Sequence, residues 1–291
     1  MANNYDMASV NLPRAAMFCL ATAFFLSIMT MFVKLAAPYT TNSVTIFFRF
    51  MVSFIYVTLI LIYKTIRGNP ISLKPQKLWL HILRAAFGVA SMLCLYYSLK
   101  FIPLMDASLL KMTNPLFIPI LAIILLGVKT KPKVIISIII GFLGIILVIR
   151  PGLGMVDHHA IYALASGVCT AFVVILLREV AKQDKPQVIM FYYFLFAAVA
   201  GGLIALTNWR TPNTHTLMLL LGVGIFGSLY QDCIIRASRY APASIVSVFL
   251  YTTVVFNGIL DWLVWGIKPD LCTIVGLMII CGASYFVVKH R

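Results

Sequence analysis

Acidic side chains are scarce in this sequence. Its 291 residues include only 8 Asp and Glu against 23 Lys and Arg, and charged residues of both signs make up 11% of the chain. Soluble globular proteins carry about 25% charged residues, so this composition excludes a water-soluble fold. The few carboxylates are not clustered, which leaves no pair for acid–base catalysis.

Motifs that carry catalytic or metal chemistry are also missing. The six cysteines lie inside apolar runs without a C-x-x-C spacing, and the five histidines lack the spacing of metal ligands. There is no glycine-rich phosphate loop and no nucleophile elbow. The sequence therefore predicts neither an enzyme nor a metal site, and it indicates no disulfide framework.

Apolar residues are what the chain has in excess, at 62%. A helix needs about 20 mostly apolar residues to cross a hydrocarbon core about 30 Å thick. Breaks at Gly, Pro and charge clusters leave ten such runs, at 14–35, 43–63, 77–101, 103–127, 133–150, 159–181, 186–207, 214–239, 241–266 and 270–289. We therefore predict an all-α integral membrane protein with ten transmembrane helices.

The basic residues lie mainly between these runs. Fourteen Lys and Arg fall in or beside one set of alternate connections, and the other set has only five: Lys34, Lys100, Arg150, Arg210 and Lys268. Because cytoplasmic connections are enriched in Lys and Arg, both termini are predicted to be cytoplasmic. The positive charge thus indicates topology rather than nucleic-acid binding. The absence of extra domains and of eukaryotic sorting signals favours a bacterial inner membrane.

The sequence contains an internal repeat. Residues 16–50 align without gaps onto 160–194, and residues 78–127 align onto 217–266. Aligned residues include Ala16/Ala160, Leu20/Leu164, Val44/Val188, Phe47/Phe191, Phe87-Gly88/Phe226-Gly227, Cys94/Cys233, Pro103/Pro242, Thr113/Thr252 and Gly127/Gly266.

The repeat divides the chain into two halves, 14–150 and 159–289. Each half has five spans, an odd number, so the second half enters the membrane from the opposite side. Such inverted repeats are typical of secondary transporters, whose substrate site lies between the halves near the midplane.

Several motifs resemble one family. They are Phe47-Phe48-Arg49-Phe50, Leu83-Arg84-Ala85-Ala86-Phe87-Gly88, Asn114-Pro115-Leu116-Phe117 and Gly141-Phe142-Leu143-Gly144. In this order and spacing, the chain resembles the EamA-type transporters of the drug/metabolite transporter superfamily. The resemblance implies ten helices, cytoplasmic termini, no bound cofactor and alternating access around a central cavity. Within the superfamily, the first half looks most like S-adenosylmethionine uptake carriers or amino-acid exporters.

Ionisable residues deep inside spans are candidates for the site, because a charge in hydrocarbon is costly. Lys111 lies about eight residues inside the fourth span. Asn114 and Pro115 would share its helix face, and Pro115 would free a backbone carbonyl one turn earlier. The alternative is that Lys111 pairs with an acid on a neighbouring helix.

The eighth span offers a second polar stripe. Ser228, Asp232 and Arg236 recur every four residues, with Gln231 beside them. Asp232 suits a substrate ammonium or a translocated proton. The alternative is an Asp232–Arg236 pair that simply neutralises itself one turn apart.

Further candidates are more dispersed. Arg84 is expected to bind an anionic substrate group or to hold a cytoplasmic gate, Tyr97 to stack on a substrate, and Tyr251 to face the cavity. Asp106 and Asp261 are alternative cation or proton sites. Other cations near span ends, Lys34 and Arg49 among them, are interpreted as interface anchors.

The sequence thus predicts a secondary carrier of a small polar metabolite, with an amino acid or an S-adenosylmethionine-like solute favoured. Coupling to a proton or a counter-substrate is expected, and both a monomer and a homodimer remain open. The alternatives are a flippase or handler of a lipid-linked group and a channel-like protein.

Overall fold

The computed structural model describes residues 12–68, 72–126, 132–149, 158–181, 183–240, 246 and 249–290, and within them it contains helices and no strand. The helices are α1 (Leu12–Ala36), α2 (Asn42–Ile66), α3 (Leu78–Ser98), α4 (Leu104–Lys111), α5 (Asn114–Leu126), α6 (Pro132–Ile149), α7 (His158–Ala181), α8 (Pro186–Thr207), α9 (Thr214–Tyr240), α11 (Thr252–Trp265) and α12 (Leu271–His290). Of the aligned repeat positions, Gly127 and Pro242 lie outside the described residues.

Local sequence signals set several helix ends. Thr41 caps α2 by accepting a hydrogen bond from the Val44 backbone N–H. Pro186 occupies the first turn of α8, where its missing N–H costs nothing. Gly266 ends α11 at a φ of 68°, a left-handed conformation that favours glycine.

The bundle is that of a multi-pass membrane protein. Within the described residues, α1, α2, α3, α7, α8 and α9 are each long and apolar enough to cross a membrane, and the other apolar helices are shorter. Large apolar side chains point outward, among them Leu59, Leu203 and Leu263. Helices satisfy their own backbone polar groups, so this apolar outer surface can face lipid.

The predicted fourth span is broken in two. The chain leaves the helical conformation at Met112 and Thr113, between α4 and α5. The prediction that Asn114 and Pro115 share a helix face with Lys111 is therefore wrong, because the four-residue spacing applies only along an unbroken helix.

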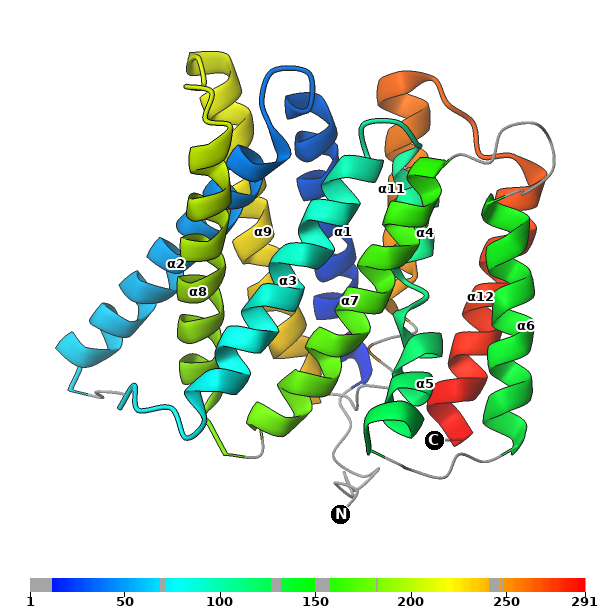
Figure 1. Cartoon of the computed structure of the whole chain (residues 1–291), viewed down its shortest axis with the longest axis horizontal. Coiled ribbons are helices and arrows are strands. Elements are labelled where there is room, and N and C mark those ends of the chain that lie inside the picture. The colour runs from blue at the N-terminus through cyan, green and yellow to red at the C-terminus, as the bar shows by residue number, and fades with distance from the viewer. Residues whose placement is uncertain are drawn as a thin grey trace.

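Helices of the first half of the sequence pack mainly on helices of the second. The strongest contacts join α1 to α9, α3 to α7, α2 to α8, and α6 to α12, while α4 packs on α11. Figure 1 shows α1 rising from the lower end of the bundle, at which α12 ends, whereas α7 descends towards it. The end at which α1 begins and α12 ends is called the lower end, and the opposite end is called the upper end.

Candidate functional site

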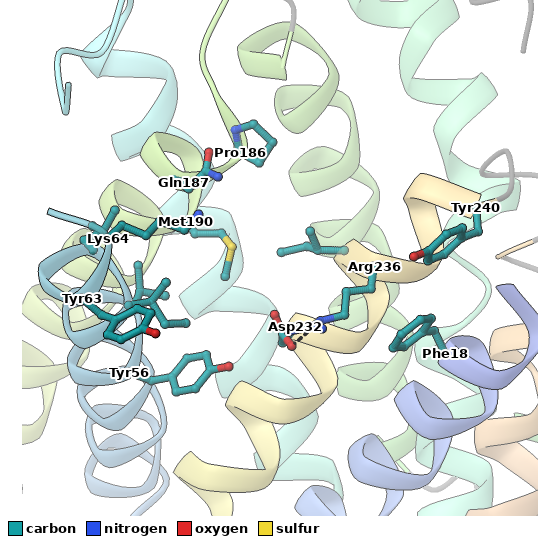
Figure 2. Close-up of a pocket in the computed structure, with 14 residues that line it drawn as sticks. Phe18, Tyr56, Tyr63, Lys64, Pro186, Gln187, Met190, Asp232, Arg236 and Tyr240 are labelled. Atoms are coloured by element: carbon teal, nitrogen blue, oxygen red, sulfur yellow. Dashed lines mark hydrogen bonds and ion pairs between the residues drawn. The ribbon is translucent and has the colours of Figure 1, made fainter. Parts of the chain in front are cut away.

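A cavity of about 530 Å³ opens at the lower end of the bundle. It lies between α1 and α2 of the first half and α8 and α9 of the second (Figure 2). Its lining is both polar and aromatic, with Phe18, Tyr56, Tyr63, Lys64, Gln187, Met190, Asp232, Arg236 and Tyr240 among its residues.

Asp232 and Arg236 form the ion pair that their spacing predicts. The Nε of Arg236 donates to Oδ2 of Asp232 at 2.8 Å, one turn apart on α9 (Figure 2). The side chain of Arg236 is 54% exposed and that of Asp232 is 27% exposed, so the pair is open to the cavity. The cavity therefore offers a solute one accessible carboxylate and one accessible guanidinium.

Arg49 lies in the middle of the bundle, in contradiction to its interpretation as an interface anchor. Its side chain is fully buried, and it donates to the Gly227 carbonyl at 2.9 Å and to Ser53. Ser53 in turn shares a 2.8 Å hydrogen bond with Ser228. A side chain at position 227 would collide with the guanidinium, so glycine on α9 makes room for Arg49.

The sequence repeat contains a signal that could have identified Arg49. At the offset of the first alignment, Arg49 corresponds to Tyr193. Tyr193 lies against Gly88, which aligns with Gly227. Each half thus places a large polar side chain over the equivalent glycine of the other half.

Arg84 and Lys111 lie near Arg49. The guanidinium of Arg84 stacks over the ring of Tyr193 at 4.1 Å, and the side chain is 5% exposed. Lys111 is partly exposed and within electrostatic range of Arg49. The expected ion pair between Lys111 and an acid on a neighbouring helix is not formed with any described carboxylate.

Tyr251 and Asn114 hold the break between α4 and α5. The Tyr251 hydroxyl donates to the Met112 carbonyl at 3.0 Å, and the Asn114 amide approaches the Lys111 carbonyl at 3.5 Å. Tyr251 itself immediately precedes α11, and it aligns with Met112 in the repeat. The two halves are therefore interrupted at equivalent positions, which face each other.

Two predicted residues lie apart from these groups. Tyr97 packs against Tyr162 and Phe101 with ring centroids 4.6 and 5.3 Å away, near the upper end of α3. It is thirteen residues from Arg84, about 220° around the helix, and so lies on another face. Gln231 is partly exposed on α9 but does not line the lower cavity.

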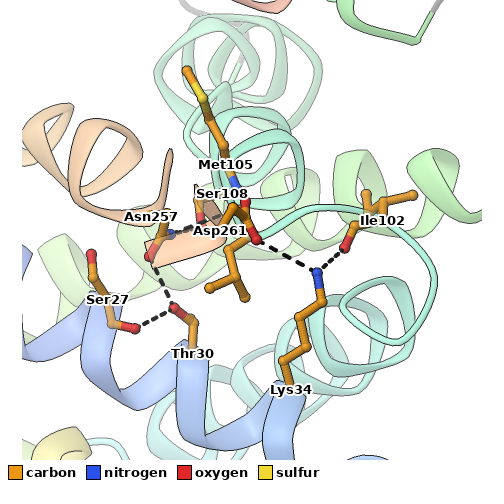
Figure 3. A network of polar contacts seen from close by, with 9 residues as sticks. Ser27, Thr30, Lys34, Ile102, Met105, Ser108, Asn257 and Asp261 are labelled. Atoms are coloured by element: carbon orange, nitrogen blue, oxygen red, sulfur yellow. Dashed lines mark hydrogen bonds and ion pairs between the residues drawn. The ribbon is translucent and has the colours of Figure 1, made fainter. Parts of the chain in front are cut away.

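The upper end is closed by polar contacts between α1, α4 and α11. Lys34 lies 3.6 Å from Asp261 and donates to the Ile102 carbonyl at 3.0 Å (Figure 3). Asp261 also accepts the Met105 backbone N–H at 2.9 Å. Lys34 is therefore a partner of Asp261 rather than the predicted interface anchor.

Hydrogen bonds continue this closure towards the centre. Thr30 on α1 donates to Asn257 on α11 at 3.2 Å, and the Asn257 amide donates to Ser108 on α4 (Figure 3). Ser27 adds a bond to the Thr253 carbonyl at 3.2 Å. The sequence offers Asp261 as a cation or proton site, but no local spacing identifies its partners Lys34 and Met105, which lie more than 150 residues away.

A multi-pass helical bundle with a polar cavity between its halves has the architecture of a membrane transport protein. The chain belongs to the EamA-like transporter family, whose model matches residues 13–150 and again residues 159–289. This match confirms the resemblance that the sequence motifs indicate.

Three curated relatives are carriers of different solutes. The chain is 27% identical to a pseudopaline exporter of Pseudomonas aeruginosa, over 94% of this chain and 95% of that protein. It is 24% identical to an S-adenosylmethionine uptake transporter of Rickettsia prowazekii, over 83% and 81% of the two chains. It is 26% identical to a riboflavin transporter of Vibrio cholerae, over 81% and 80%.

One solved crystal structure, whose name states no function, has the same fold. It aligns over 95% of this chain and 98% of its own, with a TM-score of 0.64 at 17% identity. This likeness concerns the arrangement of the helices alone.

Proposed function

We propose that this protein is a secondary transporter that moves a small polar metabolite across the inner membrane by alternating access. In this proposal, ten spans form two inverted repeats, 14–150 and 159–289, with both termini in the cytoplasm. The double match of the family model, the helix pairing between halves and the opposite directions of α1 and α7 support the repeats.

The observation that carries the proposal is the difference between the two ends of the bundle. The lower end has a cavity of about 530 Å³ between the halves, whereas at the upper end polar contacts join α1 to α11 and the hollows are smaller, about 240 and 430 Å³. With cytoplasmic termini, the described conformation is the inward-open one. Rocking of one half against the other would break the Lys34–Asp261 contact and close the cavity.

The proposed solute is a zwitterion, such as an amino acid or an S-adenosylmethionine-like compound. Asp232 would bind its ammonium or sulfonium group, and Arg236 its carboxylate. Gln231 lies next to Asp232 on α9 but outside the cavity lining. Lys111, Asn114 and Tyr251 lie at the helix breaks, and Arg84 stacks on Tyr193. The relatives carry pseudopaline, S-adenosylmethionine and riboflavin, so a small polar solute is favoured. Coupling to a proton or a counter-substrate completes the proposal.

Uptake into proteoliposomes tests this function. A labelled panel of amino acids, S-adenosylmethionine, riboflavin and organic cations would be offered with and without a pH gradient. We expect saturable uptake of one solute class, lost in Asp232→Asn and retained in Lys133→Gln, a matched removal of one charge outside the cavity. No saturable uptake of any solute by folded protein would contradict the proposal. Equal uptake by both variants would contradict the assignment of Asp232.

A further inference from the structure

The centre of the bundle concentrates positive charge. Lys111 on α4 lies within electrostatic range of Arg49 on α2, and Tyr193, whose ring faces Arg84 on α3, lies within range of both arginines. Tyr193 and Tyr96 each lie within electrostatic range of Arg49. The ion pairs found between described residues involve Lys34, His81 and Arg236, so no described carboxylate neutralises the three central cations.

Hydrogen-bond donors in this cluster lack acceptors. The Nε and Nη1 of Arg84, the Nε of Arg49 and the hydroxyl of Tyr96 are buried, and none has a partner among the described residues. Lys111 likewise has no hydrogen bond or ion pair from its ammonium group to a described residue. Buried donors are normally satisfied, and unpaired ones lower the stability of the fold.

The compensation within the protein is partial. Aromatic rings face two of the cations, since Tyr193 lies 4.1 Å from the Arg84 guanidinium carbon and Tyr230 lies 5.4 Å from that of Arg49. A ring stabilises a cation without neutralising it, and it leaves the N–H groups unbonded. Arg49 is further held by Gly227 and Ser53. Arg49 therefore keeps only its Nε unpaired, whereas Arg84 and Lys111 are the cations with no hydrogen bond to a described residue.

The helix breaks add to the positive potential. α5 begins at Asn114, three residues after Lys111, and α11 begins at Thr252, beside the break. The backbone N–H groups of a helix N-terminus favour anions, and interrupted helices in transporters point these ends at anionic substrate groups. The local charge and the local backbone thus favour the same sign of ligand.

We propose that this central cluster binds an anionic oxygen group of the transported solute, a carboxylate or a phosphate. Arg84 and Lys111 are its ligands, the Tyr96 hydroxyl donates a further hydrogen bond, and Arg49 supplies charge while it holds α2 to α9. This inference rests on the proposed transport function and specifies its substrate class: the solute bears a negative group that passes from Arg236 in the lower cavity to the centre of the bundle.

Thermal unfolding of purified protein in detergent tests the site directly. The probes are succinate, inorganic phosphate and the uncharged analogue succinamide. A ligand that binds only the folded state raises the Tm. We expect succinate or phosphate to raise the Tm and succinamide to have no effect. The shift should be lost in Lys111→Met and kept in Lys111→Arg and in Lys133→Gln. Which of the two anions acts at the lower concentration distinguishes a carboxylate from a phosphate site.

The unliganded protein gives a second readout. If Lys111 is an unpaired cation awaiting a ligand, Lys111→Met raises the Tm without anion, whereas a structural ion pair would make the same change lower it. Equal anion shifts in wild type and Lys111→Met, or no shift with either anion, would overturn the proposal. Arg84→Gln should likewise lose the anion shift, and Arg84→Lys, which keeps the charge, should retain part of it.

Transport separates this inference from the proposed function. Saturable uptake of an acid, with equally good uptake of its amide, would refute the anion site and leave the carrier. Anion-dependent stabilisation of a protein that transports nothing would refute the carrier and leave the site.

Discussion

The two ends of the bundle each contain an Asp that contacts a basic side chain, and the two pairs differ in what they join. At the upper end, Asp261 of α11 contacts Lys34 of α1, and it is only 2% exposed. At the lower end, Asp232 contacts Arg236 of the same helix, in an open cavity. The upper pair ties the two halves together, and the lower pair leaves them free.

The difference between the two ion pairs indicates why the cavity opens at the lower end of the bundle. A polar contact closes a bundle only if it crosses between parts that move separately. One buried pair does cross at the lower end, where His81 lies 2.9 Å from Asp184 in the connection between α7 and α8. That pair is not part of the cavity lining, so it does not close the cavity between α1, α2, α8 and α9.

Asp261→Asn should lower the stability of the fold more than any other variant proposed for either end of the bundle. The change leaves the Lys34 ammonium without a carboxylate in a buried site, and breaking such a pair typically costs about 3–5 kcal/mol. Denaturant or thermal unfolding in detergent measures this loss. Asp232→Asn is the matched control, with an expected loss of at most about 1 kcal/mol because its pair is exposed. Equal losses of unfolding free energy in the two variants would mean that the upper pair does not hold the halves together more firmly than the lower pair.

Transport should be affected more by Asp232→Asn than by Asp261→Asn, the reverse of the effect on stability. Asp232→Asn removes a charged contact to the solute, and hydrogen bonds to charged groups contribute about 1.5–3 kcal/mol, so uptake kcat/KM should fall at least about tenfold. Initial uptake rates in proteoliposomes measure the fall. Glu in place of Asp232 keeps the carboxylate and should restore part of the rate; an inactive Glu variant together with an active Asn variant would refute a role for the charge.

Gly227→Ala tests the contact between the two halves at the centre of the bundle. The added methyl group collides with the Arg49 guanidinium, and such overpacking costs about 1–3 kcal/mol. Gly282→Ala is the control, because nothing lies within 4 Å of the new carbon there and Ala gains helix stability. We expect unfolding measurements to move in opposite directions for the two variants. A stabilised Gly227→Ala would mean that Arg49 does not occupy this space.

The smallest expected effect belongs to Thr30→Val. This change removes the hydrogen bond from α1 to Asn257 and should cost about 1 kcal/mol, the usual net value of one hydrogen bond. Because it weakens the upper closure without leaving a charge unpaired, it should also favour opening at that end. Labelling of a cysteine introduced at Met105, in a protein without its other cysteines, reports this opening. An unchanged labelling rate would limit the closure to the Lys34–Asp261 pair.

The sequence predicted the helices well and the contacts between distant residues poorly. The predicted span 43–63 lies within α2, and 186–207 has the bounds of α8. Apolar run length alone sets these spans. Run length does not detect a break of two residues, so the sequence predicts one continuous helix through Met112 and Thr113.

In the candidate site, too, contacts within one helix were predictable and contacts between distant residues were not. The Asp232–Arg236 pair was predictable because both residues lie on one helix, one turn apart. The depth of Arg49 in its span predicts an interface anchor, because the sequence does not say which face of α2 is buried. The partner of Lys34 is 227 residues away, and no local spacing identifies it.

The exchange of Arg49 for Tyr193 at equivalent positions has a consequence for recognition. An ancestral pair of identical half-length chains would present the same group from both walls, and a solute could enter in two orientations of equal energy. In the proposed inverted repeat, one wall carries a guanidinium and the other a phenol, each over its own glycine. In that proposal the two halves keep their pseudo-symmetry, while the different groups on the two walls should give a bound molecule one preferred orientation.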